Sequence, residues 1–145
     1  MEMRKIDVNR LKIDEVIDKG IEFHGHLGPF LVTGIKMGHL ALKELNSRGY
    51  SELNVLVETG TKPPISCLID GIQISTGCTL GKGNVEVINK KKVRAIFTKD
   101  GKSTEIKLRP DILKMISEEK DSYEEMAKQL SKMPEERLFQ WRQLR

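Results

Sequence analysis

Residues 85–108 read VEVINKKKVRAIFTKDGKSTEIKL, and this stretch decides the predicted fold class. Two short runs rich in β-branched and aromatic residues, 85–88 and 93–97, are joined by Asn-Lys-Lys-Lys, and a third, 104–108, follows Lys-Asp-Gly-Lys. Asp-Gly between alternating apolar residues is a strong hairpin signal. The stretch therefore predicts an antiparallel meander of three strands.

Helical patterns precede the meander. Over 8–23, apolar residues recur mostly at spacings of three or four residues, which predicts an amphipathic helix. A second helix is expected from Pro29 to near Arg48, because proline is favoured in a first helical turn. Residues 53–57 (LNVLV) predict a buried strand, and 67–74 (CLIDGIQI) predict a short helix.

Two glycines and one histidine lie inside the second predicted helix. Glycine in a helix interior costs about 0.5 to 1 kcal/mol relative to alanine. Gly34 and Gly38 are four residues apart on one face, so we expect a backbone or a ligand to pack closely there. His39 is assigned to packing or to the surface.

After Pro110 the composition is helical to Arg145, with starts expected at Asp111, at Asp121 or Ser122, and at Pro134. The order of elements predicts an α+β fold, with N-terminal helices packed on a mostly antiparallel sheet and C-terminal helices after it. We expect a core domain over 1–109 and a helical extension of the same domain over 110–145.

The composition is that of a globular chain. Of 145 residues 38% are hydrophobic and 32% charged, and no run reaches the roughly eighteen apolar residues of a membrane span or has the pattern of a secretory leader. We therefore expect a cytoplasmic protein without membrane contact. The run Lys90 to Lys92 has no interleaved aromatic residues to stack on bases, so nucleic acid is not an expected partner.

The stretch TGCTLGKGN, residues 76–84, has the appearance of a phosphate loop. A Walker A loop needs four residues before its Gly-Lys and a hydroxyl residue after it, whereas here three residues separate Gly77 from Gly81 and Gly83 follows Lys82. Nucleotide hydrolysis is therefore rejected. Two interpretations stay open: an anion site formed by amides and Lys82, and a tight turn that needs glycine.

Four side chains could bind a metal. His24 and His26 lie in FHGHLGP between two predicted helices, and the two cysteines, Cys67 and Cys78, lie near the ends of regular elements. Two imidazoles and two thiolates would complete a tetrahedral zinc site, and three of the four would leave a position for water or substrate. Buried cysteine, however, is commonly a small hydrophobic residue.

Other polar residues add to this candidate site. Asp70 and Gln73 would share one helix face with Cys67, and Asp70 could orient an imidazole or accept a proton. Glu58, at the end of a predicted strand, is a further candidate carboxylate. A weaker alternative is a cysteine nucleophile, Cys78, with one of the histidines as its base.

Two stretches closely resemble one known family. FHGHLGPFLVTGIKMG at 23–38 and PPISCLIDGIQISTGCTLGKGN at 63–84 are similar, in the same order, to the FmdE family, which takes its name from the E-type chain of formylmethanofuran dehydrogenase. The similarity covers the part of the chain before the C-terminal helices. Many relatives have a cysteine shortly after the second histidine, where this chain has Gly28, and some append a four-cysteine zinc ribbon that this sequence lacks.

The resemblance implies an α+β core that tends to form a homodimer, with a cleft that holds the histidine and cysteine motifs and a divalent metal, usually taken to be zinc. It also implies an archaeal or anaerobic bacterial source. The complex for which the family is named is a molybdenum or tungsten enzyme that reduces carbon dioxide to the formyl level on methanofuran. Its redox centres belong to other subunits.

We therefore expect a metal-binding FmdE-like protein with zinc on some of His24, His26, Cys67 and Cys78. The catalytic candidates are His24, Asp70 and Cys78. A small anionic or carbonyl substrate would be held by Gln73, Gly81, Lys82, Gly83 and Asn84. The alternative is a non-catalytic subunit or interaction module of a redox complex, and the sequence leaves open whether the chain is an enzyme.

Overall fold

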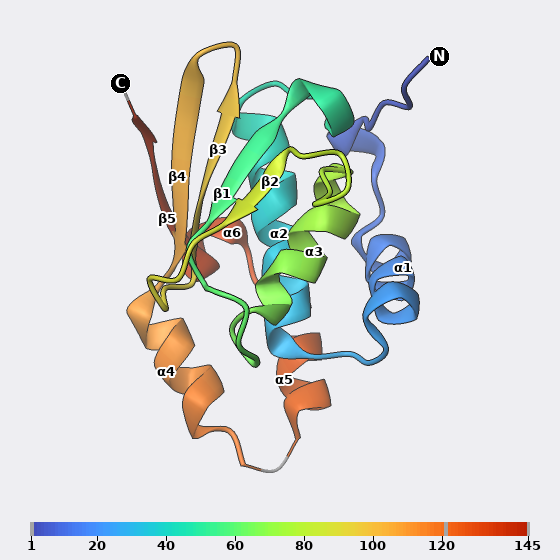
Figure 1. The fold of residues 1–145 in the computed structure, drawn as a ribbon. Helices are drawn as coiled ribbons and strands as arrows, with labels where there is room; N and C mark the ends of the chain where they lie inside the picture. Colours follow the sequence, from blue (N-terminus) through green and yellow to red (C-terminus); the bar gives the residue numbers. More distant parts are fainter. Residues whose placement is uncertain (1, 121, 145) are drawn as a thin grey trace.

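The computed structural model describes residues 2–120 and 122–144 (Figure 1). The helices are η1 (Val8–Arg10), α1 (Ile13–His24), α2 (Pro29–Glu44), η2 (Tyr50–Glu52), α3 (Cys67–Thr76), α4 (Pro110–Glu118), α5 (Tyr123–Ser131) and α6 (Glu135–Leu138). The strands are β1 (Asn54–Val57), β2 (Val85–Val87), β3 (Arg94–Lys99), β4 (Lys102–Leu108) and β5 (Phe139–Leu144). The predicted α+β class is confirmed.

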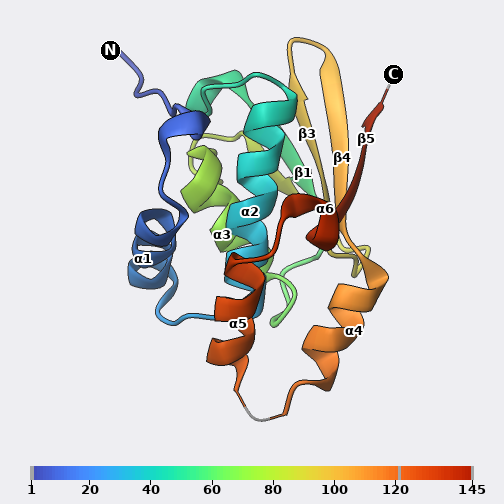
Figure 2. The same ribbon diagram turned by 180° about the vertical axis from the view of Figure 1, so that it is seen from behind.

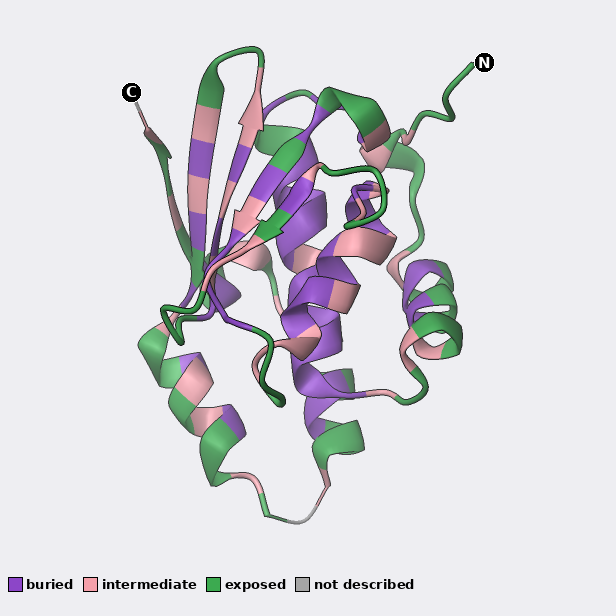
Figure 3. Cartoon of the chain, viewed as in Figure 1, coloured by how far each residue is buried: buried purple, intermediate pink, exposed green. Residues whose placement is uncertain are grey.

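Helices α2 and α3 lie side by side against one face of the sheet, and α1 packs on their outer side (Figure 1, Figure 2). Helix α2 is buried along most of its length (Figure 3), since it contacts α3 and α5 as well as the sheet. Helices α4 and α5 extend beyond one end of the sheet (Figure 1). Within the described residues, no helix combines the length and apolar character that crossing a bilayer requires.

The sheet has the order β2-β1-β3-β4-β5, with β1 and β2 parallel and the other neighbours antiparallel. The predicted hairpin is confirmed, because β3 and β4 pair through a turn at Asp100 and Gly101, both at positive φ. The predicted antiparallel pairing of 85–88 with 93–97 is wrong, because β2 pairs in parallel with β1, which lies between β2 and β3. The loop after β2 crosses the end of β1, where Lys90 and Lys92 donate backbone N–H groups to the Glu58 carbonyl.

The C-terminal segment differs from the prediction in its last residues. The expected starts at Asp111, Ser122 and Pro134 correspond to α4, α5 and α6, and the alternative start at Asp121 lies outside the described residues. The prediction that helix continues to the end is wrong, because β5 follows the short α6. This strand covers the edge of β4 and buries Phe139 completely.

Helices α2 and α3 approach closely, and the prediction of close packing at Gly34 and Gly38 is confirmed, because a Cβ on either residue would overlap atoms of α3. A Cβ on Gly34 would overlap the carbonyl oxygen of Leu68 and lie 3.0 Å from the Cα of Gly71. A Cβ on Gly71 would overlap the carbonyl oxygen of Leu31. The two backbones therefore touch directly, and the position of α3 on α2 is set by the lack of side chains there.

Gly34→Ala should destabilise the fold. Its methyl group meets rigid backbone, so the helices must separate, and overpacking of this kind costs about 2 kcal/mol even after the gain in helix propensity. The measurement is the free energy of unfolding from denaturant titration. Gly81→Ala is the matched control, because its Cβ would meet only the Thr79 hydroxyl at 3.9 Å. Equal stabilities of the two variants would contradict the close packing.

Candidate functional site

His24 and Asp70 form a contact between α1 and α3. His24 is the last residue of α1, which ends because Gly25 adopts the left-handed conformation (φ +103°) and its N–H donates to the Ile21 carbonyl. Asp70 lies in the first turn of α3. The Nδ1 of His24 lies 2.6 Å from an Asp70 carboxylate oxygen, and the His24 side chain is only 10% exposed.

The second ring nitrogen of His24 is buried and makes no hydrogen bond within the described residues. An ionised carboxylate only accepts hydrogen bonds, so Nδ1 would carry the proton of this contact, and in a neutral imidazole the lone pair would then be on Nε2. A buried polar atom without a partner carries a cost, and it points to a ligand, an ion or a water molecule. Asp70 thus holds the His24 ring at Nδ1, and Nε2 has no partner within the described residues.

A cavity of about 400 Å³ lies beside this pair. Its wall includes His26 and Cys67 as well as His24, and the His24 and His26 ring centroids are 4.7 Å apart. The rest of the lining is mostly apolar and comes from the start of α2, the loop before α3, and the helices α4 and α5: Gly28, Pro29, Phe30, Leu31, Pro64, Ile65, Leu113, Ile116, Ser117 and Tyr123.

The structure brings together three of the four predicted metal ligands. Cys67 begins α3 and lines the cavity, whereas Cys78 follows the other end of α3 and is fully buried. The Cys78 thiol donates to the Leu53 carbonyl at 3.4 Å. Burial raises the pKa of both thiols, and the Asp70 charge raises that of Cys67 further. Both cysteines thus favour the protonated form.

Within residues 2–120 and 122–144, no group of three or more His, Cys, Asp and Glu side chains is placed to hold a metal ion. His24, His26 and Cys67 share a cavity without forming a finished coordination sphere. The Asp70 carboxylate is engaged with the Nδ1 of His24. Side chains would therefore have to turn for all three cavity donors to meet one ion.

The glycine-rich loop lies at the other end of α3 and is tied together by its own polar groups. Asn84 accepts from the N–H of Thr79 and donates to the carbonyls of Tyr50 and Leu53. Gln73 accepts from the N–H of Leu80. These bonds anchor the loop to the start of β1.

The remaining donors of this loop are largely occupied as well. The backbone N–H and the ammonium of Lys82 both donate to the Thr79 hydroxyl, and the N–H of Gly83 donates to the Leu80 carbonyl. Gly83 has positive φ, as a tight turn requires, and a Cβ on Gly81 would meet only the Thr79 hydroxyl. Anion binding by Lys82 and the neighbouring amides stays a prediction that this geometry does not favour.

Glu58 has a structural environment. It is almost completely buried, pairs with Arg94, and lies 3.2 Å from the ammonium of Lys90. The hydrogen bond from Arg94 is the main cause that lowers the pKa of Glu58. The carboxylate therefore holds the β2–β3 loop on the end of β1 and lies outside the His24 cavity.

Sequence reasoning missed the wall that α4 and α5 contribute to the cavity. Leu113 and Ile116 lie on one face of α4, and Tyr123 begins α5. The spacing of Leu113 and Ile116 is that of one helix face, and this is the signal that the sequence carries. It could not indicate that this face covers a cavity rather than the core.

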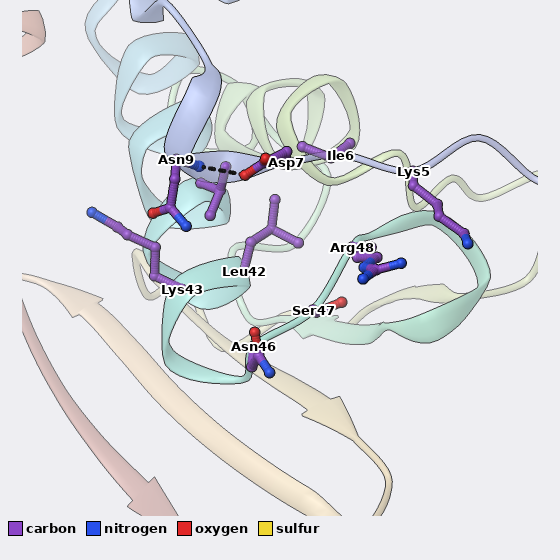
Figure 4. A pocket seen from close by; sticks show the side chains of 10 residues that line it. Lys5, Ile6, Asp7, Asn9, Leu42, Lys43, Asn46, Ser47 and Arg48 are labelled. Carbon is purple, nitrogen blue, oxygen red and sulfur yellow. Dashed lines mark hydrogen bonds between the residues drawn. The ribbon is translucent and has the colours of Figure 1, made fainter.

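A larger, more open cavity of about 570 Å³ lies between the N-terminal segment and the end of α2 (Figure 4). Lys5, Asn46 and Arg48 line it, and all three are exposed. Its Asp7 carboxylate already accepts from the N–H of Asn9. It contains no buried polar atom comparable to His24 Nε2 within the described residues, so it is the weaker candidate.

The fold defines a small α+β protein with two closely packed helices on a mostly antiparallel sheet. The family model described as FmdE, Molybdenum formylmethanofuran dehydrogenase operon, matches residues 23–144, and the chain therefore belongs to the FmdE family. The match runs across the predicted boundary between 1–109 and 110–145.

The similarity extends to individual proteins. A tungsten formylmethanofuran dehydrogenase FmdE-like protein from Syntrophus aciditrophicus has the same fold, with a TM-score of 0.73, 22% identity, and coverage of 98% of this chain and 77% of that one. A probable S-adenosyl-L-methionine-binding protein from Archaeoglobus fulgidus is 28% identical over 86% of this chain. This chain spans only 38% of that relative's length.

His39 is buried and faces charged groups. Its Nε2 has no partner within the described residues, and it lines a cavity of about 220 Å³ with Lys36 and Lys43 of α2 and with Glu135 of α6. Burial, and secondarily the two lysine charges, lower the pKa of His39 from 6.5 to about 4. The ring is therefore neutral in the folded protein at neutral pH.

This shift predicts a pH dependence of stability. Between pH 6.5 and about 4 the unfolded chain binds the His39 proton and the folded chain does not, so stability falls as pH falls, by at most about 1.4 kcal/mol per pH unit. Unfolding titrations of the wild type and His39→Gln across this window measure the difference. His26→Gln, at an exposed histidine, is the control. Parallel curves for the wild type and His39→Gln would refute the buried neutral ring.

Proposed function

We propose that the His24 cavity is a metal-dependent ligand site, with zinc as the expected ion. The observation that carries this proposal is the buried, unpartnered Nε2 of His24, whose Nδ1 is held by the Asp70 carboxylate. Histidines that bind metals usually donate their other ring N–H to a carboxylate, a carbonyl or a water molecule, which fixes the ring and raises its basicity. His24 has this arrangement.

The donors near His24 fit zinc in kind. Imidazole and thiolate are the ligands that zinc prefers in proteins, and His26 and Cys67 line the same cavity. Cys78 is not included in this proposal, because its thiol is bonded to a backbone carbonyl at the other end of α3. Three protein ligands would leave one position open, as in catalytic zinc sites.

When bound, zinc would supply Lewis acidity or a more acidic water molecule. The chain's own groups would fix the orientation of the His24 ring and the polarity of the cavity. Asp70 holds the His24 ring at Nδ1, and the walls from α2 and α4 make most of the cavity lining apolar. The Cys67 thiol, whose pKa is raised by burial, would lose its proton on binding the metal.

Metal content tests the proposal through a pair of cysteine variants. The wild type, purified without added metal, should hold about one zinc ion per chain, because one such cavity offers the three donors. Cys67→Ser and His24→Ala should lose most of it, and Cys78→Ser should keep it. Elemental analysis with a protein assay gives the ratio.

Far-ultraviolet circular dichroism of each variant provides the folding control. A wild type that remains metal-free after exposure to zinc, cobalt or nickel at neutral pH would exclude the metal proposal. Loss of metal from Cys78→Ser while Cys67→Ser keeps it would exclude this ligand set.

A second candidate function is suggested by the descriptions of the relatives. Both the family and the Syntrophus protein are described in terms of formylmethanofuran dehydrogenase. We propose, as the alternative, that the chain is a subunit or interaction module of a molybdenum- or tungsten-containing redox complex. Homodimer formation also remains a proposal. The S-adenosyl-L-methionine binding named for the Archaeoglobus relative is not carried over to this chain, because most of that protein lies outside the match.

Affinity purification from the native source distinguishes the two candidates. A chain that belongs to such a complex should recover molybdenum- or tungsten-containing partners at a constant ratio through gel filtration, because stable interfaces survive dilution. His24→Ala is the matched variant: it should abolish metal binding in the isolated chain, and it should leave assembly intact. Recovery of the chain alone, with its zinc, would contradict the role in a complex.

A further inference from the structure

A cavity of about 530 Å³, here called the Lys62 cavity, is formed by residues 59–65, 87–89 and 91. Lys62 and Lys91 line it, and no Asp or Glu is among its described lining residues. Other cavities with lysines differ, since the cavity of Figure 4 includes Asp7 and the His39 cavity includes Glu135. A cleft whose charges have one sign attracts solutes of the opposite sign.

The ammonium groups of Lys62 and Lys91 have no hydrogen-bond or ion-pair partner within residues 2–120 and 122–144. Both side chains are exposed. Glu58, the carboxylate that precedes residues 59–65 in the sequence, is already paired with Arg94 and Lys90. Two positive charges with three N–H donors each therefore line one cavity without a carboxylate to neutralise them.

The loop that carries Lys91 is held on the end of β1. The backbone N–H groups of Lys90 and Lys92 both donate to the Glu58 carbonyl. Lys91, between them, adopts the left-handed conformation with φ +53°, which is uncommon for a residue other than glycine, asparagine or aspartate. Such a conformation persists where the surrounding contacts impose it, so the backbone of Lys91 has a defined position.

The two segments that form the cavity are also joined directly. Thr59 and Asn89 form an isolated antiparallel bridge, and the N–H of Gly60 donates to the Ile88 carbonyl at 2.8 Å. A Cβ on Gly60 would overlap the Asn89 side chain, so the segments touch at this point. The backbones that carry the two lysines are therefore fixed relative to each other before any ligand binds.

The rest of the wall is partly apolar. Pro64, Ile65 and Ile88 line the Lys62 cavity, and Pro64 and Ile65 also line the His24 cavity, so the two cavities are neighbours. A volume of about 530 Å³ is within the usual range of small-molecule sites, which combine apolar surface with a few polar groups. A simple inorganic ion would leave this apolar surface without a contact.

We propose that the Lys62 cavity binds a small organic anion, with a carboxylate or phosphate group at Lys62 and Lys91 and an apolar body against Pro64, Ile65 and Ile88. The site uses none of the candidate metal ligands, and the proposal does not depend on the proposed function. It gives the anionic ligand expected from the sequence a different place, away from Lys82 and the glycine-rich loop.

Four probes with one aromatic body test the ligand class: 2-naphthoate, 2-naphthyl phosphate, 2-naphthol and 2-naphthylmethylamine. Naphthalene fluorescence anisotropy gives the affinities, and the backbone amide resonances of Gly60 and Lys91 report the place of binding. The two anions should bind about fivefold or more tightly than the alcohol and the ammonium, because exposed ion pairs contribute modestly each. The tighter of the two anions identifies the head group.

Salt and inorganic phosphate test the two parts of the ligand. Anion affinity should fall as the salt concentration rises to about 0.5 M, because exposed charges are screened. Inorganic phosphate should bind more weakly than naphthyl phosphate, because it lacks the apolar body. If 2-naphthol binds as tightly as the anions, or if the Gly60 and Lys91 resonances do not move, the proposal is wrong.

A double variant, Lys62→Gln with Lys91→Asn, removes both charges. Asparagine tolerates the left-handed conformation of residue 91, so the loop should keep its shape. Affinity for both anions should fall about fivefold and that for 2-naphthol should not change. The matched control is Lys19→Gln with Lys102→Gln, which removes the same charge at two exposed lysines outside the cavity. Equal anion affinities of the two double variants would contradict the site.

His24→Ala and chelator-treated wild type separate this site from the metal proposal. Both should bind the anions as well as untreated protein does, because the lysines are independent of the metal donors. Anion binding in a wild type that takes up no zinc would support the Lys62 site and refute only the metal site. Anion binding that disappears in His24→Ala or after chelation would refute the Lys62 site.

Discussion

The direct contact of the α2 and α3 backbones at Gly34 and Gly71 is the constraint on which the rest of the structure depends. Helix α3 is short, and a helix of ten residues has little stability of its own. Its position follows from contact with α2, which is possible only because neither helix has a side chain at the crossing point. Once α3 is seated in this way, its first turn faces the end of α1. Asp70 meets His24, and Cys67 joins His26 in the cavity wall, as consequences of that packing.

The same helix separates two features that are adjacent in sequence. The stretch from Pro64 to Asn84 contains cavity residues and the glycine-rich loop, and α3 places them at opposite ends. At one end, His24 Nε2 has no partner within the described residues and the Cys67 thiol lines a mostly apolar cavity. At the other end, the side chains of Asn84, Gln73 and Thr79 accept hydrogen bonds from backbone N–H groups of the loop. Unpaired polar atoms are expected where a ligand binds, and paired ones where a loop is held rigid.

Much of the fold could be predicted because it depends on local patterns. The Asp100-Gly101 hairpin and the helix starting at Pro29 follow from backbone preferences, and the paired glycines in α2 indicated a close approach. Strand pairing and β5 could not be predicted, because they depend on which edge remains unpaired after folding. Lys90 and Lys92 donate backbone N–H groups to the Glu58 carbonyl at the end of β1, a contact between distant segments. The chain after Pro134 has helical composition, yet residues 139–144 form a strand because they pair with the edge of β4.

The sequence predicted which types of residue form the candidate site, but it did not predict which of the candidate residues meet there. His24, His26 and Cys67 were selected by chemistry and meet in one cavity, and Cys78 was selected by the same chemistry and does not. The sequence alone does not distinguish the two thiols as candidate ligands, since both lie near the ends of regular elements. The difference arises from burial: the Cys78 thiol contacts the Leu53 carbonyl inside the core, and Cys67 lines a cavity. The apolar wall from α4 then determines what the cavity can accept. An ionised group that enters the cavity finds no Lys, Arg, Asp or Glu among the described lining residues, so the side chains of Leu113 and Ile116 contribute to selectivity through the cost of leaving such a group unpaired.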